Sequence, residues 1–132
     1  MTTGHDLMAG TFFEHAPEPA FVMDPRRNRV VAANHAGCAL LGYTRDEMIG
    51  LHVARIHPSE MRELSALLSE VARNGRASTI TLTCRTKTGT FLPTEISLHA
   101  LMLEEGVRIL GLVQDRSDHR QRVHAERRLS RD

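Results

Sequence analysis

AANHAGCALLGYTRDEMIG, residues 32–50, contains two helix-start signals in close succession. Asn34 is a preferred N-cap, because its side-chain oxygen can accept a hydrogen bond from a free backbone N–H of the first helical turn. Gly42 is suited to end that helix, and TRDE, from Thr44 to Glu47, has the pattern of a capping box that opens a second one. The stretch therefore predicts two very short helices, one directly after the other.

A hairpin is predicted immediately before these helices. AFVMD (20–24) and VVAAN (30–34) are short apolar runs, and Pro25 and Asn28 mark a turn between them. Residues 6–16 further upstream are typical of a short helix with Leu7, Met8, Phe12 and Phe13. Pro17 and Pro19 end that helix, because proline cannot continue it.

The chain after Gly50 is predicted to form one more helical turn and then its longest helix. HVARIHP (52–58) ends at Pro58, and Pro58 or Ser59 opens the helix SEMRELSALLSEVARNG (59–75). One apolar stripe runs along this helix through Met61, Leu64, Leu68 and Val71. The pair Asn74-Gly75 is its stop signal.

Beyond Gly75 the apolar period changes to two, which indicates strands. Ile80, Leu82 and Cys84 are predicted to face the interior, while Thr79, Thr81, Thr83 and Arg85 face outward. After a turn at Gly89, Thr94, Ile96, Leu98, Ala100 and Met102 are predicted to share one face of the next strand. In the last strand, Val107, Ile109 and Val113 share one face and Leu110 and Leu112 the other, so that strand should be central. The element order indicates an α+β fold, with helices on one face of an antiparallel sheet.

Five segments from about Phe12 to Arg120 resemble the PAS domain family. They are FFEHAPEPAFVMD, VVAANHAGCALLGYTRDEMIG, IHPSEMREL, TKTGTFLPTEISL and GLVQDRSDHR. The resemblance implies a five-stranded antiparallel sheet in the order 2-1-5-4-3, with short helices and one longer helix around a pocket on one face. It divides the chain into an N-terminal flanking helix (1–14), the PAS domain (15–116) and a C-terminal linker or signalling helix (117–132).

The resemblance also implies a role in bacterial signal transduction. The domain would be a sensory module of a histidine kinase, cyclase or transcriptional regulator, whose output lies outside this chain, so that the chain is either a fragment or a stand-alone module. Two hypotheses stay open. The domain senses a small ligand or cofactor in an apolar pocket and relays the signal through its C-terminal helix, or it is a ligand-free module for homodimerisation or protein interaction.

Under the first hypothesis, one apolar stripe lines the pocket. Its members are Phe21, Leu40, Met48, Ile56, Met61, Leu64, Leu68, Ile80, Leu82, Ile96 and Leu98, with Thr94 as a polar contact. The same stripe is what a solid core without a ligand requires, so the pattern alone does not choose between the two hypotheses.

Under the second hypothesis, apolar side chains outside the core form a dimer interface. These are Phe12 and Phe13 on the first helix and Leu101, Leu110 and Leu112 on the outer face of the sheet. Burial of such groups against a second copy stabilises a dimer by about 25 cal/mol per Å², and we expect a homodimer under either hypothesis. Under either hypothesis, Asp115 and Arg120 occupy the closing motif of the family, where Asp115 would cap the exit helix and pair with Arg120 in signal relay.

Two cofactors are tested by single positions. Haem-binding relatives have their proximal histidine seven residues after the position of Pro58, where this chain has Ser65, which argues against haem by that route. Blue-light flavin relatives have a reactive cysteine three residues after the position of Gly50, where this chain has Val53, so the flavin photoadduct cannot form. Loosely bound FAD or a small metabolite stays open as the ligand.

His35 and Cys38 have helical spacing but supply only two ligands, whereas a zinc site needs three or four. We therefore predict no metal site and interpret the pair as packing and surface residues. The sequence has no nucleophile elbow, phosphate loop or metalloprotease motif, so we predict no catalytic residues.

Composition limits the partners of the chain. Its 132 residues carry a formal net charge of only +1. The Arg-rich tail after Asp115 mixes both signs and lacks aromatic groups, so we predict no nucleic-acid binding by this domain. No apolar run approaches the roughly 20 residues of a membrane span. Because the two cysteines form no disulfide framework and no secretory leader is present, we expect a cytoplasmic location.

Overall fold

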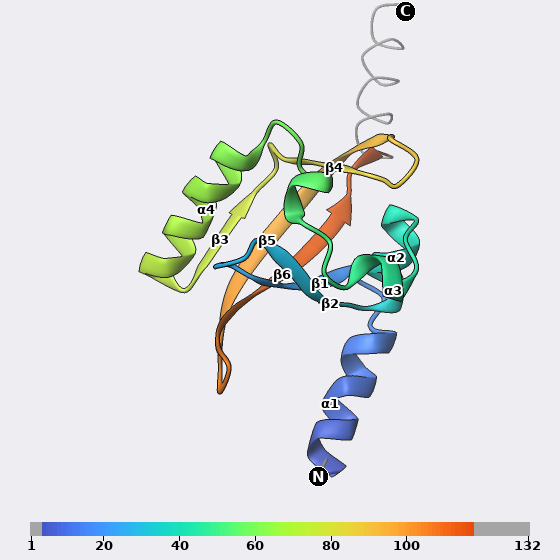
Figure 1. Cartoon of the computed structure of the whole chain (residues 1–132), viewed down its shortest axis with the longest axis vertical. Coiled ribbons are helices and arrows are strands. Elements are labelled where there is room, and N and C mark those ends of the chain that lie inside the picture. The colour runs from blue at the N-terminus through green and yellow to red at the C-terminus, as the bar shows by residue number, and fades with distance from the viewer. Residues whose placement is uncertain (1–3, 118–132) are drawn as a thin grey trace, which may run out of the picture.

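The computed structural model of the chain describes residues 4–117 (Figure 1). The elements in chain order are α1 (Gly4–His15), β1 (Ala20–Asp24), β2 (Arg29–Ala33), α2 (His35–Leu41), α3 (Arg45–Met48), the 3-10 turn η1 (Val53–Arg55), α4 (Met61–Asn74), β3 (Arg76–Thr79), β4 (Thr83–Arg85), β5 (Phe91–Leu103) and β6 (Gly106–Asp115). The helix at the N-terminus, the hairpin, the two short helices and the longer helix are all present as predicted.

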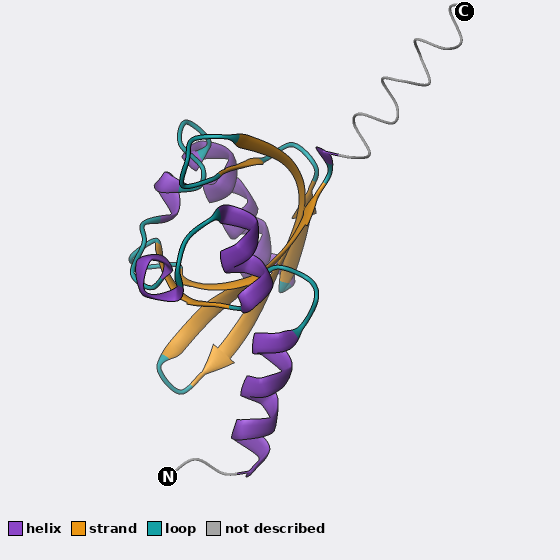
Figure 2. Ribbon diagram, turned by 90° about the vertical axis from the view of Figure 1, so that its right-hand side faces the viewer, coloured by secondary structure: helices purple, strands orange, loops and turns teal. Residues whose placement is uncertain are grey.

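The strands form one curved antiparallel sheet. Their order is β2-β1-β6-β5-β3, and β4 also pairs with β5. Figure 2 shows α2, α3 and α4 on the inner side of this curve, while α1 projects from the body of the domain. An ion pair between Glu14 and Arg45 connects the end of α1 to α3. The expected α+β class is confirmed, with β6 in the middle of the sheet.

The sheet differs from the expected one in its third strand, which is divided into β3 and β4. Thr79 lies opposite Ile96, and Thr83 lies opposite Pro93. Residues 80–82, which connect β3 to β4, therefore lie opposite only two residues of β5, as in a β-bulge. The extra residue shifts the alternation of inward and outward side chains by one position. The prediction that Ile80 faces the interior is wrong for this reason: its side chain is 60% exposed.

The caps of the two short helices agree with the sequence. The Asn34 side chain accepts a hydrogen bond from the N–H of Gly37 at 2.8 Å, and Gly42 ends α2 with φ 81°. Thr44 and Glu47 form the reciprocal capping box of α3. A hydrogen bond from Lys87 lowers the pKa of the Glu47 carboxyl to about 2. These caps fix where α2 and α3 begin beside the sheet.

The longer helix begins later than predicted, at Met61. The residue before it, Glu60, makes no side-chain cap of α4. Its carboxylate instead accepts hydrogen bonds from the Thr83 N–H at 3.1 and 3.2 Å and from the Thr83 hydroxyl at 3.3 Å. The start of α4 is therefore tied to β4.

The loop that follows α3 is tied to β2 by backbone hydrogen bonds. The N–H of Gly50 donates to the carbonyl of Val30 at 2.8 Å, and the N–H of Val30 donates to the carbonyl of Leu51 at 2.9 Å. The N–H of Val53 donates to the carbonyl of Asn28 at 2.9 Å. Residues 50–53 therefore lie along β2 and bring η1 over the sheet.

Among residues 4–117, no helix combines the length and the apolar character needed to cross a membrane.

Candidate functional site: an apolar cavity in the core

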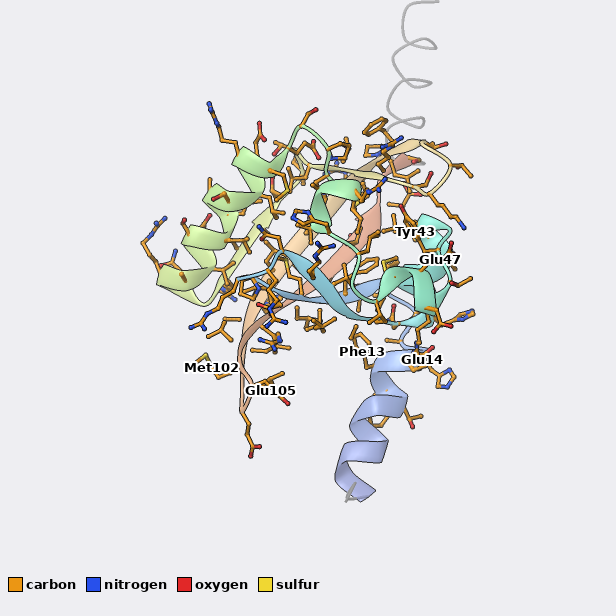
Figure 3. The ribbon with its side chains drawn as sticks, in the orientation of Figure 1. Phe13, Glu14, Tyr43, Glu47, Met102 and Glu105 are labelled. Atoms are coloured by element: carbon orange, nitrogen blue, oxygen red, sulfur yellow. The ribbon has the colours of Figure 1, made fainter. Side chains whose placement is uncertain are left out.

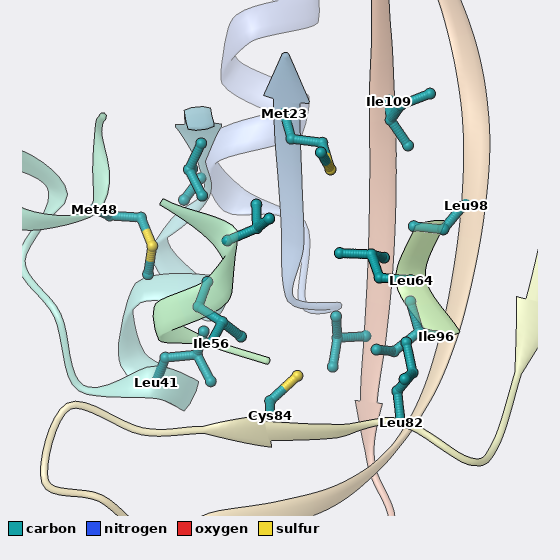
Figure 4. Close-up of a cluster of buried hydrophobic side chains, with 14 of the residues drawn as sticks. Met23, Leu41, Met48, Ile56, Leu64, Leu82, Cys84, Ile96, Leu98 and Ile109 are labelled. Carbon is teal, nitrogen blue, oxygen red and sulfur yellow. The ribbon is translucent and has the colours of Figure 1, made fainter. Parts of the chain in front are cut away.

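The core of the domain lies between the curved sheet and the helices α2 to α4. Figure 4 shows its buried side chains converging from both layers, with Leu41 and Met48 from the helical side and Ile96, Leu98 and Ile109 from the sheet. Leu41 and Met48 are completely buried. The two layers therefore share one apolar interior.

A cavity of about 60 Å³ lies within this core. Its lining consists of Phe21, Met23, Val30, Leu41, Val53, Ile56, His57, Leu64, Cys84, Ile96, Leu98, Ile109, Gly111 and Val113. Pockets that bury drug-sized ligands have volumes of roughly 300–1,000 Å³. This cavity is therefore suited to a much smaller guest.

The residues predicted to line a pocket fall into three groups. Phe21, Ile56, Leu64, Ile96 and Leu98 line the cavity. Met48, Leu82 and Thr94 are buried but lie outside its lining, and Leu40 is half-buried against the core. Met61 and Leu68 are half-buried and border a shallow groove beside the turn of the first hairpin, while Ile80 faces solvent.

The prediction omitted part of the lining. The omitted residues are Met23, Val30, Leu41, Val53, His57, Cys84, Ile109, Gly111 and Val113. For Ile109 and Val113 the sequence carried a usable signal, because their alternation already indicated a common face of the last strand. For His57 it carried none.

Among the described residues that line the cavity, only His57 has a side chain with a nitrogen or oxygen atom. The residue is 8% exposed, and its Nδ1 lies 2.8 Å from the carbonyl oxygen of Thr83 and 3.4 Å from Oε1 of Glu60. A carbonyl oxygen can only accept, so Nδ1 carries the proton and donates to Thr83. Burial lowers the pKa of His57 below its ordinary value of 6.5 and outweighs the two polar contacts, so the ring is neutral at pH 7.

This burial predicts that His57 makes the domain sensitive to acid. Because the folded state has the lower pKa, the unfolded state binds more protons, and stability falls as the pH drops below 6.5. Urea unfolding between about pH 7 and about pH 5 should show a smaller decline in the free energy of unfolding for His57→Gln, which can still donate to Thr83 but does not titrate. Equal declines in both proteins would contradict this prediction.

Thr94 is buried next to the cavity and Cys84 lines it, but the first side chain is occupied and the second is chemically inert. The Thr94 hydroxyl donates to the carbonyl of Leu82 at 2.7 Å, so it is not a free donor. Burial raises the pKa of the Cys84 thiol to about 12, and a protonated buried thiol is a poor nucleophile. The arrangement favours binding of an apolar guest over chemistry on it.

The cavity does not fit either large cofactor. Ser65, at the position tested for haem, is exposed beside the shallow groove and does not line the cavity. Val53, at the position tested for the flavin adduct, lines the cavity with carbon atoms only. Ring systems of the size of haem or isoalloxazine need several times the available 60 Å³.

The other predicted site residues lie at the surface. Phe12 is 69% exposed, and Phe13, Leu101, Leu110 and Leu112 are half-buried. His35 is exposed and Cys38 is half-buried on α2. Within residues 4–117, no cluster of three or more potential metal ligands is present.

The proposed relay residues are described in part. The Asp115 carboxylate accepts hydrogen bonds from the Ser117 N–H at 2.9 Å and the Ser117 hydroxyl at 2.6 Å. This is the geometry of a residue that caps the start of a helix. Arg120, its predicted partner, lies outside the described residues.

Comparisons with known proteins agree with this architecture. The chain is similar to the PAS domain of a two-component sensor histidine kinase, with 17% identity over 84% of this chain and 96% of that one and a TM-score of 0.74. It is also similar to a PAS domain from Colwellia psychrerythraea, with 20% identity over 83% and 94% of the two chains and a TM-score of 0.74.

A third solved structure has a higher sequence identity. It is a domain of a sensory box sensor histidine kinase/response regulator from Geobacter sulfurreducens, 28% identical over 84% of this chain and 94% of that chain, with a TM-score of 0.67. Among curated proteins, no relative matches in sequence. A family model described as PAS domain matches residues 17–118. That match spans most of the chain, which therefore belongs to the PAS domain family.

Proposed function

We propose that this PAS domain is the sensory input of a signalling protein, and that a small apolar ligand in the cavity is its signal. The observation that carries the proposal is the apolar cavity in the core, because β6 forms part of its wall through Ile109, Gly111 and Val113. The similarity to domains of sensor histidine kinases supports a role in signal transduction.

The relay would run along β6. Val113 borders the cavity only two residues before Asp115, whose carboxylate holds Ser117. The intervening Arg116 donates its N–H to the carbonyl of Pro93 at 2.8 Å, which couples this point to the neighbouring strand β5. A guest that displaces Val113 would therefore displace the chain where it leaves the sheet.

The proposed output is a histidine kinase, cyclase or transcriptional regulator outside this chain, and the domain itself has no assigned catalytic residue. We also propose a cytoplasmic location, consistent with free thiols at Cys38 and Cys84.

The test compares native and denaturing mass spectra of the chain purified without added ligand. We expect extra mass that disappears on denaturation, and we expect Gly111→Val to lose it, because a side chain at Gly111 enters the cavity beside Leu98. Leu112→Val, on the opposite face of β6, is the matched control and should keep the ligand. Native spectra without extra mass for the wild type and for both variants would contradict the ligand-sensing proposal.

The relay predicts a specific effect for Asp115→Ala. Loss of the two bonds to Ser117 should weaken the helix start by about 0.5–2 kcal/mol and accelerate amide hydrogen exchange at Ser117. The melting temperature of the domain should change little, because Asp115 is exposed. Asp115→Asn, which can still cap, should resemble the wild type. A fall in melting temperature as large as that of a core variant would contradict the relay role.

A second candidate function, ligand-free dimerisation, is favoured by the exposure of Phe12. Figure 3 shows the neighbouring Phe13 at the domain end of α1 and Met102 close to the tip of the β5–β6 hairpin, and both elements extend from the same end of the domain. Sedimentation velocity of wild type and Phe12→Ser tests this function. A dimer that dissociates in the variant, together with bare native spectra, would favour it over ligand sensing.

A further inference from the structure

We propose that the cavity selects a small, mostly apolar molecule with one hydrogen-bond donor, such as a short-chain alcohol, and that Nε2 of His57 accepts this donor. The inference rests on the proposed function, because it names the class of ligand that the same cavity takes. It follows from three properties of the cavity: its single polar group, the protonation of that group, and its size.

The first property is the distribution of polar atoms. Every lining side chain in the described part of the chain other than His57 presents only carbon or sulfur, or, for Gly111, hydrogen. The hydroxyl of the buried Thr94 is directed to the Leu82 carbonyl, and the Cys84 sulfur lies 4.0 Å from that hydroxyl oxygen. A ligand therefore has one strong polar partner available, and the rest of its surface must be apolar.

The second property is the tautomer of His57. Since Nδ1 donates to Thr83, the neutral ring has no proton on Nε2, which is left as an acceptor. No hydrogen bond to Nε2 is formed by any residue from 4 to 117. A ligand donor that reaches Nε2 would form a hydrogen bond that an apolar ligand of the same size cannot form.

Water is a poor candidate for this place. A buried water molecule typically makes two to four hydrogen bonds, whereas the lining offers one polar side chain. A molecule with one O–H group and a hydrocarbon remainder satisfies Nε2 and also fills the apolar part. The chemistry of the lining therefore favours an alcohol over water.

The third property is size. A water-sized group occupies about 10–15 Å³ of such a cavity, so about 60 Å³ accommodates about four to six non-hydrogen atoms. Alcohols with three to five carbon atoms fall in this range. The cavity therefore excludes most aromatic metabolites by volume.

The experiment compares three probes on the purified chain by NMR: 1-butanol, 2-butanone and xenon. The alcohol and the ketone have the same number of non-hydrogen atoms, but only the alcohol is a donor, and xenon reports the apolar cavity alone. We expect 1-butanol to bind at least about fivefold more tightly than 2-butanone and to shift the ¹⁵N signal of His57 Nε2. Methyl signals of Ile96 and Leu98 should shift, while those of exposed Leu103 should not.

His57→Phe is the matched variant, because it keeps a ring at this position and removes the acceptor. It should still bind xenon, and its preference for the alcohol over the ketone should disappear. The wild-type comparison stands on its own if the variant does not fold.

The outcomes separate this inference from the function on which it rests. If xenon binds but the ketone binds as tightly as the alcohol or more tightly, the proposed role of His57 is overturned, while the cavity remains a ligand-binding site. Failure of all three probes to reach the Ile96 and Leu98 methyl groups, together with bare native mass spectra, would overturn both.

Discussion

Asn34→Ala should lower the free energy of unfolding by roughly 3–5 kcal/mol, the largest effect we expect from a single substitution here. The Asn34 side chain is fully buried and joins three segments. Its Oδ1 accepts from the N–H groups of Gly37 at 2.8 Å and Ala20 at 3.0 Å, and its Nδ2 donates to the carbonyl of Glu18 at 2.9 Å. Alanine would leave these buried backbone groups without partners and remove the cap of α2.

Urea unfolding monitored by circular dichroism measures this effect. Asn74→Ala is the matched control, because Asn74 is exposed at the end of α4 and its side chain makes no hydrogen bond to residues 4–117. The control should change the free energy of unfolding by no more than about 0.5 kcal/mol. An Asn34→Ala effect of the same size as the control would show that the network contributes nothing to stability.

Leu41→Ala is expected to produce the second large effect, a loss of about 2–5 kcal/mol. Leu41 is completely buried at the end of α2, contacts the core cluster and lines the cavity. Removal of three carbon atoms therefore costs their transfer free energy and enlarges an existing void. The enlarged cavity should also admit a larger guest, which links stability to ligand range at one residue.

The measurement for Leu41→Ala is again the urea midpoint, combined with binding of toluene, whose seven non-hydrogen atoms exceed the about four to six that the wild-type cavity accommodates. Leu103→Ala is the control, because Leu103 is half-exposed at the end of β5 and packs outside the core. Its effect should stay within about 0.5 kcal/mol. A urea midpoint of Leu41→Ala equal to that of the wild type would mean that the core around α2 repacks without loss of stability.

The sequence was sufficient where the determining residues lie close together. The caps at Asn34, Gly42 and Thr44 each depend on groups within four positions, so local patterns predicted them correctly. The division of the third strand could not be predicted in this way. Leu82 and Cys84 continue the alternation from Ile80 without a break, and the extra residue appears only in the register against β5.

The candidate site was less predictable, because its lining is set by contacts between distant segments. Thr83, which fixes the tautomer of His57, lies 26 positions further along the chain. In α2 the prediction selected Leu40, whereas the cavity is lined by Leu41. A helix of seven residues has too few turns to define its inner face by period. Its orientation follows instead from the close approach of Gly37 to Phe21 and the carbonyl of Ala20.

The division of the third strand has a consequence for how the domain avoids aggregation. Outer strands of a sheet expose unpaired N–H and C=O groups that can template another chain. On β2, which is five residues long, the N–H and carbonyl of Val30 are engaged by Leu51 and Gly50. On the other side β3 and β4 are only four and three residues long, with the break at Ile80 between them. Neither border of the sheet offers a long regular run for an added strand. We therefore expect that copies of this domain associate through side-chain surfaces and helices, and that their sheets do not pair edge to edge through backbone hydrogen bonds.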